Sequence, residues 1–120
     1  MARLIMTVDD SASMREMVRA TLLSAGYEVV EAVDGQEALE YARENPCDLV
    51  ITDVNMPRMD GITLVGELRA LAHYRLTPLL LLTTESAQEN KLEGKRAGAT
   101  GWIVKPFNPD QLLATMARVL

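Results

Sequence analysis

The sequence predicts an α/β fold in which helices cover both faces of a single parallel sheet. Two hydrophobic periods alternate along the 120 residues, without an internal repeat or a linker. Short apolar runs bounded by polar or turn residues are typical of strands buried on both faces, and the stretches between them carry apolar residues at helical spacing. Five strands alternating with five helices imply parallel strands joined by right-handed crossovers. In such folds a ligand site lies beyond the carboxyl ends of the strands.

Five short runs have the composition of strands. Four are apolar and fit strands buried on both faces, whereas the second run mixes polar and apolar residues, as an edge strand does. In chain order we expect strands at Leu4–Val8, Tyr27–Ala32, Leu49–Thr52, Leu79–Leu82 and Trp102–Val104.

Two helices are expected in the first half of the chain. Gly26 can supply a left-handed C-terminal stop for the first helix. Asp34 and Glu37 resemble a capping box that starts the second, which runs to about Asn45. The apolar stripe of the first helix has helical spacing and consists of Met14, Met17, Val18, Thr21, Leu22 and Ala25.

The second half of the chain carries a third and a fifth helix with similar signals. The fifth opens with Asn108 as its cap, Pro109 at the first helical position and Gln111 three residues after the cap. The third helix has the stripe Leu64, Val65, Leu68, Leu71 and Ala72, and the fifth has Leu112, Leu113, Met116 and Leu120.

The fourth helix, between about Ala87 and Ala97, differs from the others. It is mostly polar, with Leu92 as its only large apolar anchor and Gly94 in its interior. A glycine inside a helix costs about 0.5–1 kcal/mol relative to alanine. We therefore expect this helix to be the least firmly docked element of the domain.

Composition and charge narrow the classes of function. The net charge of −5 does not suit the phosphate backbone of nucleic acid, which is bound by clustered Lys and Arg. No apolar run approaches the roughly 18 residues of a membrane span. Asp9 and Asp10 interrupt the N-terminal apolar stretch before a signal-peptide core could form. We expect a cytoplasmic protein that binds neither nucleic acid nor membrane.

Cys47 and His73 are each the only residue of their type. A single cysteine excludes an internal disulfide, and a single histidine excludes a multi-histidine metal site. We expect a half-buried thiol at Cys47 and a surface position on a helix for His73.

Polar side chains follow four of the predicted strands. Asp9 and Asp10 come after the first strand, Asp53 after the third, Thr83 after the fourth and Lys105 after the fifth. Taken singly, each could be a turn former, a helix cap or a solvated charge. Three clustered carboxylates repel one another, so either their pKa values rise or a cation joins them. Mg²⁺ is a natural partner, because it prefers oxygen ligands and is typically bound by one or two carboxylates.

The motifs at these strand ends closely resemble the receiver-domain family of response regulators. They are Val8-Asp9-Asp10-Ser11, the stretch 51–57 with Met59-Asp60-Gly61, Leu82-Thr83, and Val104-Lys105-Pro106-Phe107. The resemblance covers essentially the whole chain. It implies a flavodoxin-like, doubly wound five-stranded parallel sheet with strand order 2-1-3-4-5. It also implies one receiver domain over residues 1–120, with no output domain.

The resemblance implies a role for each site residue. Asp53 resembles the phosphoacceptor, a carboxylate nucleophile that takes a phosphoryl group from a histidine kinase. Lys105 resembles the lysine that pairs with the phosphoryl oxygens, and Thr83 the hydroxyl that moves to bond them. The implied ligands of Mg²⁺ are Asp10, Asp53 and the main-chain carbonyl of Asn55, with Asp9 acting through water. The expected protein is a phosphoacceptor switch rather than an enzyme, with intrinsic Mg²⁺-dependent autophosphorylation and autodephosphorylation.

The output of the switch is also implied by the resemblance. Trp102 is either an edge-strand packing residue or the aromatic whose rotamer couples to Thr83, a position where the family more often has Tyr or Phe. Pro106 resembles the family's cis-proline position. Asn55, Glu85 and the stretch 101–107 resemble the chemotaxis group. That group implies a monomer whose partners are a chemotaxis histidine kinase and a flagellar motor switch protein, docked on the fourth helix, fifth strand and fifth helix.

Other functions stay open at this point. Within the class, the chain could be a phosphate sink or a relay intermediate for another kinase. An aspartate-nucleophile phosphatase would need a second acid where this sequence has Asn55. A flavodoxin would need a phosphate-cradling loop where it has Asp9-Asp10-Ser11. A binding module without chemistry would leave the acidic cluster unexplained.

Overall fold

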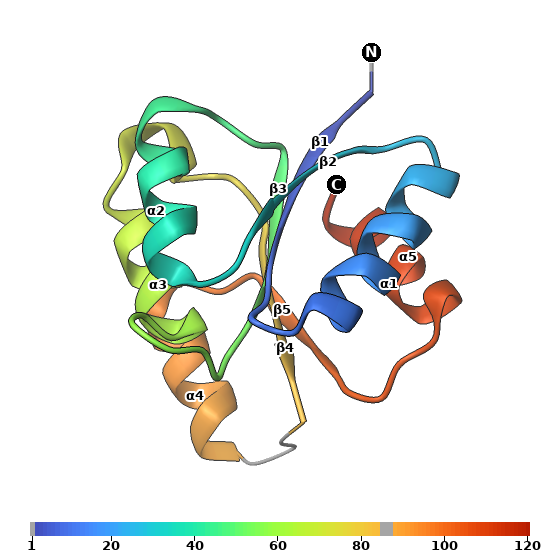
Figure 1. Ribbon diagram of the computed structural model, residues 1–120. Coiled ribbons are helices and arrows are strands. Elements are labelled where there is room, and N and C mark those ends of the chain that lie inside the picture. Colours follow the sequence, from blue (N-terminus) through green and yellow to red (C-terminus); the bar gives the residue numbers. More distant parts are fainter. Residues whose placement is uncertain (1, 85–87) are drawn as a thin grey trace.

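The computed structural model describes residues 2–84 and 88–120 and contains one five-stranded parallel sheet (Figure 1). The strand order is β2-β1-β3-β4-β5, which confirms the predicted topology. The strands are β1 Leu4–Val8, β2 Glu28–Ala32, β3 Leu49–Asp53, β4 Leu79–Thr83 and β5 Gly101–Val104. The helices are α1 Ala12–Ser24, α2 Gly35–Glu44, α3 Gly61–Arg69, the 3₁₀ helix η1 Ala72–Tyr74, α4 Gln88–Ala97 and α5 Pro109–Val119.

Helices lie on both faces of the sheet, with α1 and α5 on one side and α2, α3 and α4 on the other (Figure 1). Each side has its own apolar core. Val18 of α1 and Met116 of α5 belong to one core, and Leu39 of α2 and Leu64 of α3 belong to the other. Full burial of one such side chain contributes about 1.5–3 kcal/mol to the stability of the fold. The two cores therefore hold the three central strands, β1, β3 and β4, firmly between the helix layers.

The fifth strand was wrongly predicted to be buried on both faces. It is the second edge strand of the sheet, and only Ile103 in it is buried. Trp102 and Val104 are 37% and 39% exposed. The predicted strand order already placed this strand at an edge, but a run of three apolar residues does not reveal that one face of the strand is left partly uncovered.

The helix ends agree largely with the sequence. Gly26 has a φ of +92°, as expected for a left-handed stop after α1. Asn108 and Gln111 form a full capping box at α5. At α2 the Asp34 side chain accepts from the Glu37 N–H, but the Glu37 carboxylate accepts from the Val33 N–H rather than from that of the cap residue.

The third helix ends earlier than predicted, at Arg69, so Leu71 and Ala72 do not belong to its stripe. The cause is tertiary, because the Arg69 guanidinium donates to the carbonyl oxygens of Tyr74 and Thr77, both at 2.7 Å. The chain therefore wraps around the guanidinium instead of continuing as a helix.

The prediction that Leu92 anchors the fourth helix is wrong, since this side chain is 49% exposed. Buried Gly94 faces Leu81 instead, and a Cβ at position 94 would lie 2.6 Å from Leu81 Cδ1. The helix thus docks through a close approach of its backbone. Ala87, where the helix was predicted to begin, and Glu85 lie outside the described residues.

The single cysteine and histidine occupy the amino-terminal side of the sheet. Cys47 is buried rather than half-buried, with 8% of its surface exposed. His73 is an exposed residue of η1, and its Nε2 lies 2.6 Å from the Ala42 carbonyl oxygen. Among the helices that the structure describes, we find none with the length and apolar character needed to cross a bilayer.

Candidate functional site

The three predicted carboxylates meet at the carboxyl ends of β1 and β3. One oxygen from each of Asp9, Asp10 and Asp53 lies within 4.8 Å of the others. The parallel topology causes this convergence, because β1 and β3 are neighbours and end at the same edge of the sheet. Asp9 is buried, Asp53 is partly buried and Asp10 is exposed. The cluster is thus open to solvent on one side only.

Lys105 follows β5 and brings an ammonium group into this cluster. Its Nζ donates to Asp53 Oδ1 at 3.1 Å and to Asp9 Oδ2 at 3.5 Å. The Lys105–Pro106 peptide bond is cis, as at the family position that Pro106 resembles. One ammonium among three carboxylates leaves an excess of negative charge at the site.

The electrostatics of Asp53 reflect this crowding. Burial raises the pKa of its carboxyl group above the ordinary value, and the nearby Asp9 charge acts in the same direction. The hydrogen bond from Lys105, its positive charge, and the Val54 N–H at 3.0 Å lower the pKa in part. The net rise means that an ionised Asp53 is under-compensated by the protein alone.

The donor set fits a hard divalent cation. All side-chain ligands at the cluster are carboxylate oxygens, and the unbalanced negative charge calls for a cation of more than one charge. Asn55 lies in the loop between β3 and α3 and is exposed, two residues beyond Asp53. Chain connectivity keeps Asn55 near the cluster, and the path of the loop decides where its carbonyl points.

Thr83 ends β4 and is buried, 3% exposed, beside the strand that carries Asp53. A small enclosed hollow is lined by Val54, Leu81, Thr83, Lys91 and Trp102. The Lys91 ammonium lies 5.3 Å from the centroid of the Trp102 ring, within the range of a cation–π interaction. The hollow thus lies between Thr83, at the end of the strand next to Asp53, and an aromatic side chain that is partly exposed.

Two arginines near the site were missed by sequence reasoning. Arg15 Nη1 donates to the main-chain oxygen of Asp9 at 2.7 Å. Arg58 pairs with Asp34, which the sequence indicated only as a helix cap. The Arg58 partner is 24 residues away, and no spacing rule links the two.

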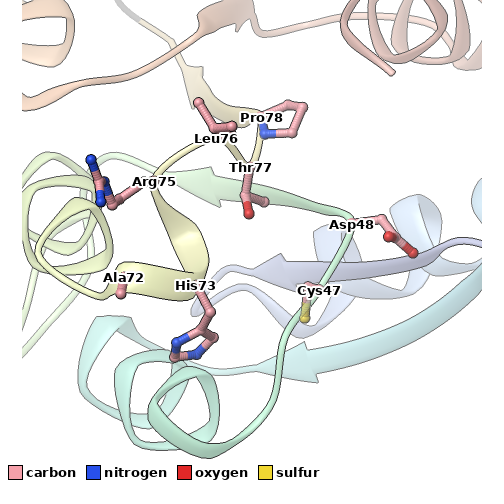
Figure 2. Close-up of a pocket in the computed structure, with 8 residues that line it drawn as sticks. All are labelled: Cys47, Asp48, Ala72, His73, Arg75, Leu76, Thr77 and Pro78. Atoms are coloured by element: carbon pink, nitrogen blue, oxygen red, sulfur yellow. The ribbon is translucent and has the colours of Figure 1, made fainter.

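A second hollow lies at the opposite end of the sheet, near the start of β3 and β4 (Figure 2). It is lined by Cys47, Asp48, Ala72, His73, Arg75, Leu76, Thr77 and Pro78. None of the predicted site residues is among them. This hollow is therefore separate from the acidic cluster.

Comparison with known proteins gives a consistent result. Residues 5–117 match the family model described as response regulator receiver domain. The structure of the Vibrio cholerae chemotaxis protein CheY4 is 52% identical, with a TM-score of 0.97 and full coverage of both chains. The receiver domain of the Pseudomonas aeruginosa sensor histidine kinase PA1611, solved with magnesium in its active site cleft, is 28% identical, with a TM-score of 0.91 over 98% of this chain and 97% of that one.

A curated relative shows that the same domain occurs in longer proteins. The Staphylococcus aureus transcriptional regulatory protein SrrA is 35% identical over 120 residues, which are 100% of this chain and 48% of that protein. The chain spans about half the length of the curated relatives it matches.

The raised pKa of Asp53 leads to a testable prediction about the pH dependence of folding stability. A raised folded-state pKa means that folding favours the protonated form, so ionised Asp53 destabilises the metal-free protein at neutral pH. We expect Asp53→Asn to raise the melting temperature in a chelator at neutral pH. The gain should shrink as the pH falls through the raised pKa towards about 4, the ordinary value.

Thermal unfolding of both proteins across this pH range measures the effect. Asp110→Asn is the matched control, because exposed Asp110 lies in the first turn of α5, where a negative charge is stabilising. It should not gain stability. Equal melting temperatures of wild type and Asp53→Asn at neutral pH would contradict the electrostatic account.

Proposed function

Because the chain belongs to the response regulator receiver family, whose members are phosphoacceptor switches of two-component signalling, we propose that Asp53 is its phosphoacceptor. The observation that carries the proposal is the meeting of Asp9, Asp10 and Asp53 with the ammonium of Lys105. Such a site can hold a phosphoryl group, since it offers a nucleophilic carboxylate, a positive charge and oxygen ligands for a metal.

The proposed reaction is phosphoryl transfer from a histidine kinase. A carboxylate oxygen of Asp53 forms a bond to phosphorus while the P–N bond of the phosphohistidine breaks, and the leaving imidazole nitrogen keeps the electron pair. Negative charge spreads over the transferred oxygens during this step. Lys105, already 3.1 Å from Asp53 Oδ1, is placed to neutralise part of it.

Magnesium would complete the site. We assign Asp10, Asp53 and the Asn55 carbonyl as its ligands, with Asp9 acting through water. When bound, the ion supplies positive charge that offsets the carboxylates and the phosphoryl oxygens. The excess of carboxylates over ammonium groups supports this assignment.

The switch itself is proposed to run from Thr83 to Trp102. New acceptor oxygens on Asp53 would draw the Thr83 hydroxyl, and the space that it leaves would favour a different rotamer of Trp102. The hollow lined by both residues supports this coupling. In the present structure Trp102 is partly exposed beneath the Lys91 ammonium.

Chemotaxis is the setting that we propose, with residues 1–120 as one monomeric, cytoplasmic receiver domain. The 52% identity to CheY4 over both full chains supports it. The kinase would then be a chemotaxis histidine kinase and the downstream partner a flagellar motor switch protein. We place the docking face on α4, β5 and α5. An assay that follows phosphoryl transfer from the kinase to this protein, and then its binding to the motor switch protein, separates this role from that of a phosphate sink or a relay intermediate.

Our first test of this function is labelling with acetyl phosphate in the presence of Mg²⁺. We expect intact-mass measurement to show one added phosphoryl group on the wild type, because a receiver needs only the donor and the metal for this step. Asp53→Asn should show none, whereas Asp110→Asn, an exposed control, should be labelled normally. Undiminished labelling of Asp53→Asn would falsify the assignment.

Trp102 provides the second test, as the only tryptophan of the chain. Beryllofluoride with Mg²⁺ mimics the phosphoryl group and should change the Trp102 emission, because the ring would leave its partly exposed position beneath Lys91. Asp53→Asn should give no change. A spectrum that stays constant while calorimetry shows the mimic bound would make Trp102 a simple packing residue.

The docking face can be tested by charge reversal on α4. Lys95 is exposed, and Lys91 lies one turn before it and contacts the Trp102 ring. Lys95→Glu should weaken mimic-dependent binding of the motor switch protein by up to about fivefold, an effect that added salt should reduce. Lys91→Glu/Lys95→Glu should weaken it further, because the reversal also removes the cation from the ring.

Arg43→Glu is the matched control for these reversals, since Arg43 is exposed in the last turn of α2, which lies away from β5. It should leave the affinity unchanged. If the double reversal binds the partner as tightly as wild type does, with the mimic still required, the output face lies elsewhere.

A further inference from the structure

A buried carboxylate outside the acidic cluster holds the loop that leaves Asp53. Asp34 is 1% exposed and precedes α2, and its two oxygens have different partners. Oδ1 accepts from the Glu37 N–H at 2.9 Å, and Oδ2 accepts from Arg58 Nε at 2.6 Å. The Arg58 Nη2 contacts the same oxygen. The hydrogen bond from Glu37 lowers the pKa of Asp34 despite its burial, so the pair is an ion pair at neutral pH.

Arg58 belongs to the loop at residues 54–60 that connects β3 to α3. Its φ of +64° lies in the left-handed region, and it is the only non-glycine residue with a positive φ in the part of the chain that the structure describes. An arginine gains nothing from this conformation by itself. Contacts therefore have to offset the cost of this conformation, and the bond to buried Asp34 is one of them.

A second contact joins the same two segments. The Gly35 N–H donates to the Met59 carbonyl at 3.2 Å, and a Cβ at Gly35 would lie 2.7 Å from that oxygen. The start of α2 thus contacts two consecutive loop residues. It forms an ion pair with Arg58, and its backbone closely approaches that of Met59. Within the loop, Gly61 N–H donates to Val54 O at 2.8 Å and closes its base.

We propose that Asp34 and Arg58 are positioning residues that hold this loop so that the Asn55 carbonyl stands ready beside Asp53 to bind Mg²⁺. The proposal rests on the magnesium ligands assigned above. Asn55 is exposed and lies three residues before Arg58 in the same loop, so the path of the loop sets the place of its carbonyl. If the loop is already ordered before Mg²⁺ binds, binding does not have to supply the free energy of ordering it, and the affinity for the metal is higher.

Two single variants separate positioning from stability. Asp34→Ser keeps an oxygen that can cap α2 but removes the partner of Arg58. Arg58→Gly removes the same ion pair while relieving the positive φ, so it should not strain the backbone. We expect each to weaken Mg²⁺ binding about tenfold in calorimetric titration, as loss of an outer-shell partner typically does. The double variant should bind no more weakly than either single one.

Arg58→Lys keeps a positive charge and should recover part of the affinity. Asp110→Ser is the matched control, because it makes the same substitution at an exposed helix start and should leave Mg²⁺ affinity unchanged. Melting temperatures in a chelator report stability separately. If Asp34→Ser does not fold, Arg58→Gly and Arg58→Lys decide the question, because Arg58 is an exposed residue.

Asp10→Ala distinguishes failure of the metal site from failure of this proposal. Undiminished Mg²⁺ binding by Asp10→Ala would overturn the ligand assignment and the positioning role with it. If Asp10→Ala loses binding while Arg58→Gly binds as wild type, the positioning role alone is overturned. Weakening in Asp34→Ser without any in Arg58→Gly would also overturn it, since that result reflects only the helix cap.

Discussion

Repulsion among three carboxylates is the constraint on which the rest of this structure depends. Parallel strands β1 and β3 end side by side, so Asp9, Asp10 and Asp53 stand within 4.8 Å of one another whatever their charge. Lys105 offsets part of the repulsion, and burial still raises the pKa of Asp53. A site with this excess of negative charge is stabilised by an added cation, and an added anion changes its balance of charge. Both effects are needed in a phosphorylation switch.

Two cations outside the cluster contact backbone or loop segments next to it. Arg15 donates to the main-chain oxygen of Asp9 and lies 3.5 Å from Glu31 on β2. Arg58 performs the corresponding task for the loop after β3, through buried Asp34. Both arginines act on backbone geometry without adding a positive charge between the carboxylates. The site therefore keeps its net negative charge, which metal binding requires, while its loops are held in place.

The fold and the meeting of the acidic residues with Lys105 could be predicted because they depend on local pattern and topology. Strand ends place Asp9, Asp53 and Lys105 together once the sheet is known to be parallel. What failed depends on tertiary contacts. The docking of α4 by Gly94 against Leu81, instead of by Leu92, depends on the distance between the helix backbone and the Leu81 side chain, which no periodicity encodes. The early end of α3 and the pairing of Arg58 likewise depend on partners distant in sequence.

The same tertiary detail explains how a small change at Asp53 could reach the surface. Thr83 and Lys105 are joined by a backbone bond of 2.7 Å between Lys105 N–H and Thr83 O, so the ends of β4 and β5 respond together. Trp102 follows on the edge strand, where no further strand restrains it, and Lys91 links its ring to α4. Among its described residues, α4 has no large buried apolar side chain and packs through its backbone at Gly94. On our proposal, α4 is attached through Lys91 to the aromatic side chain that senses the site, which is how a local charge change becomes a change of surface.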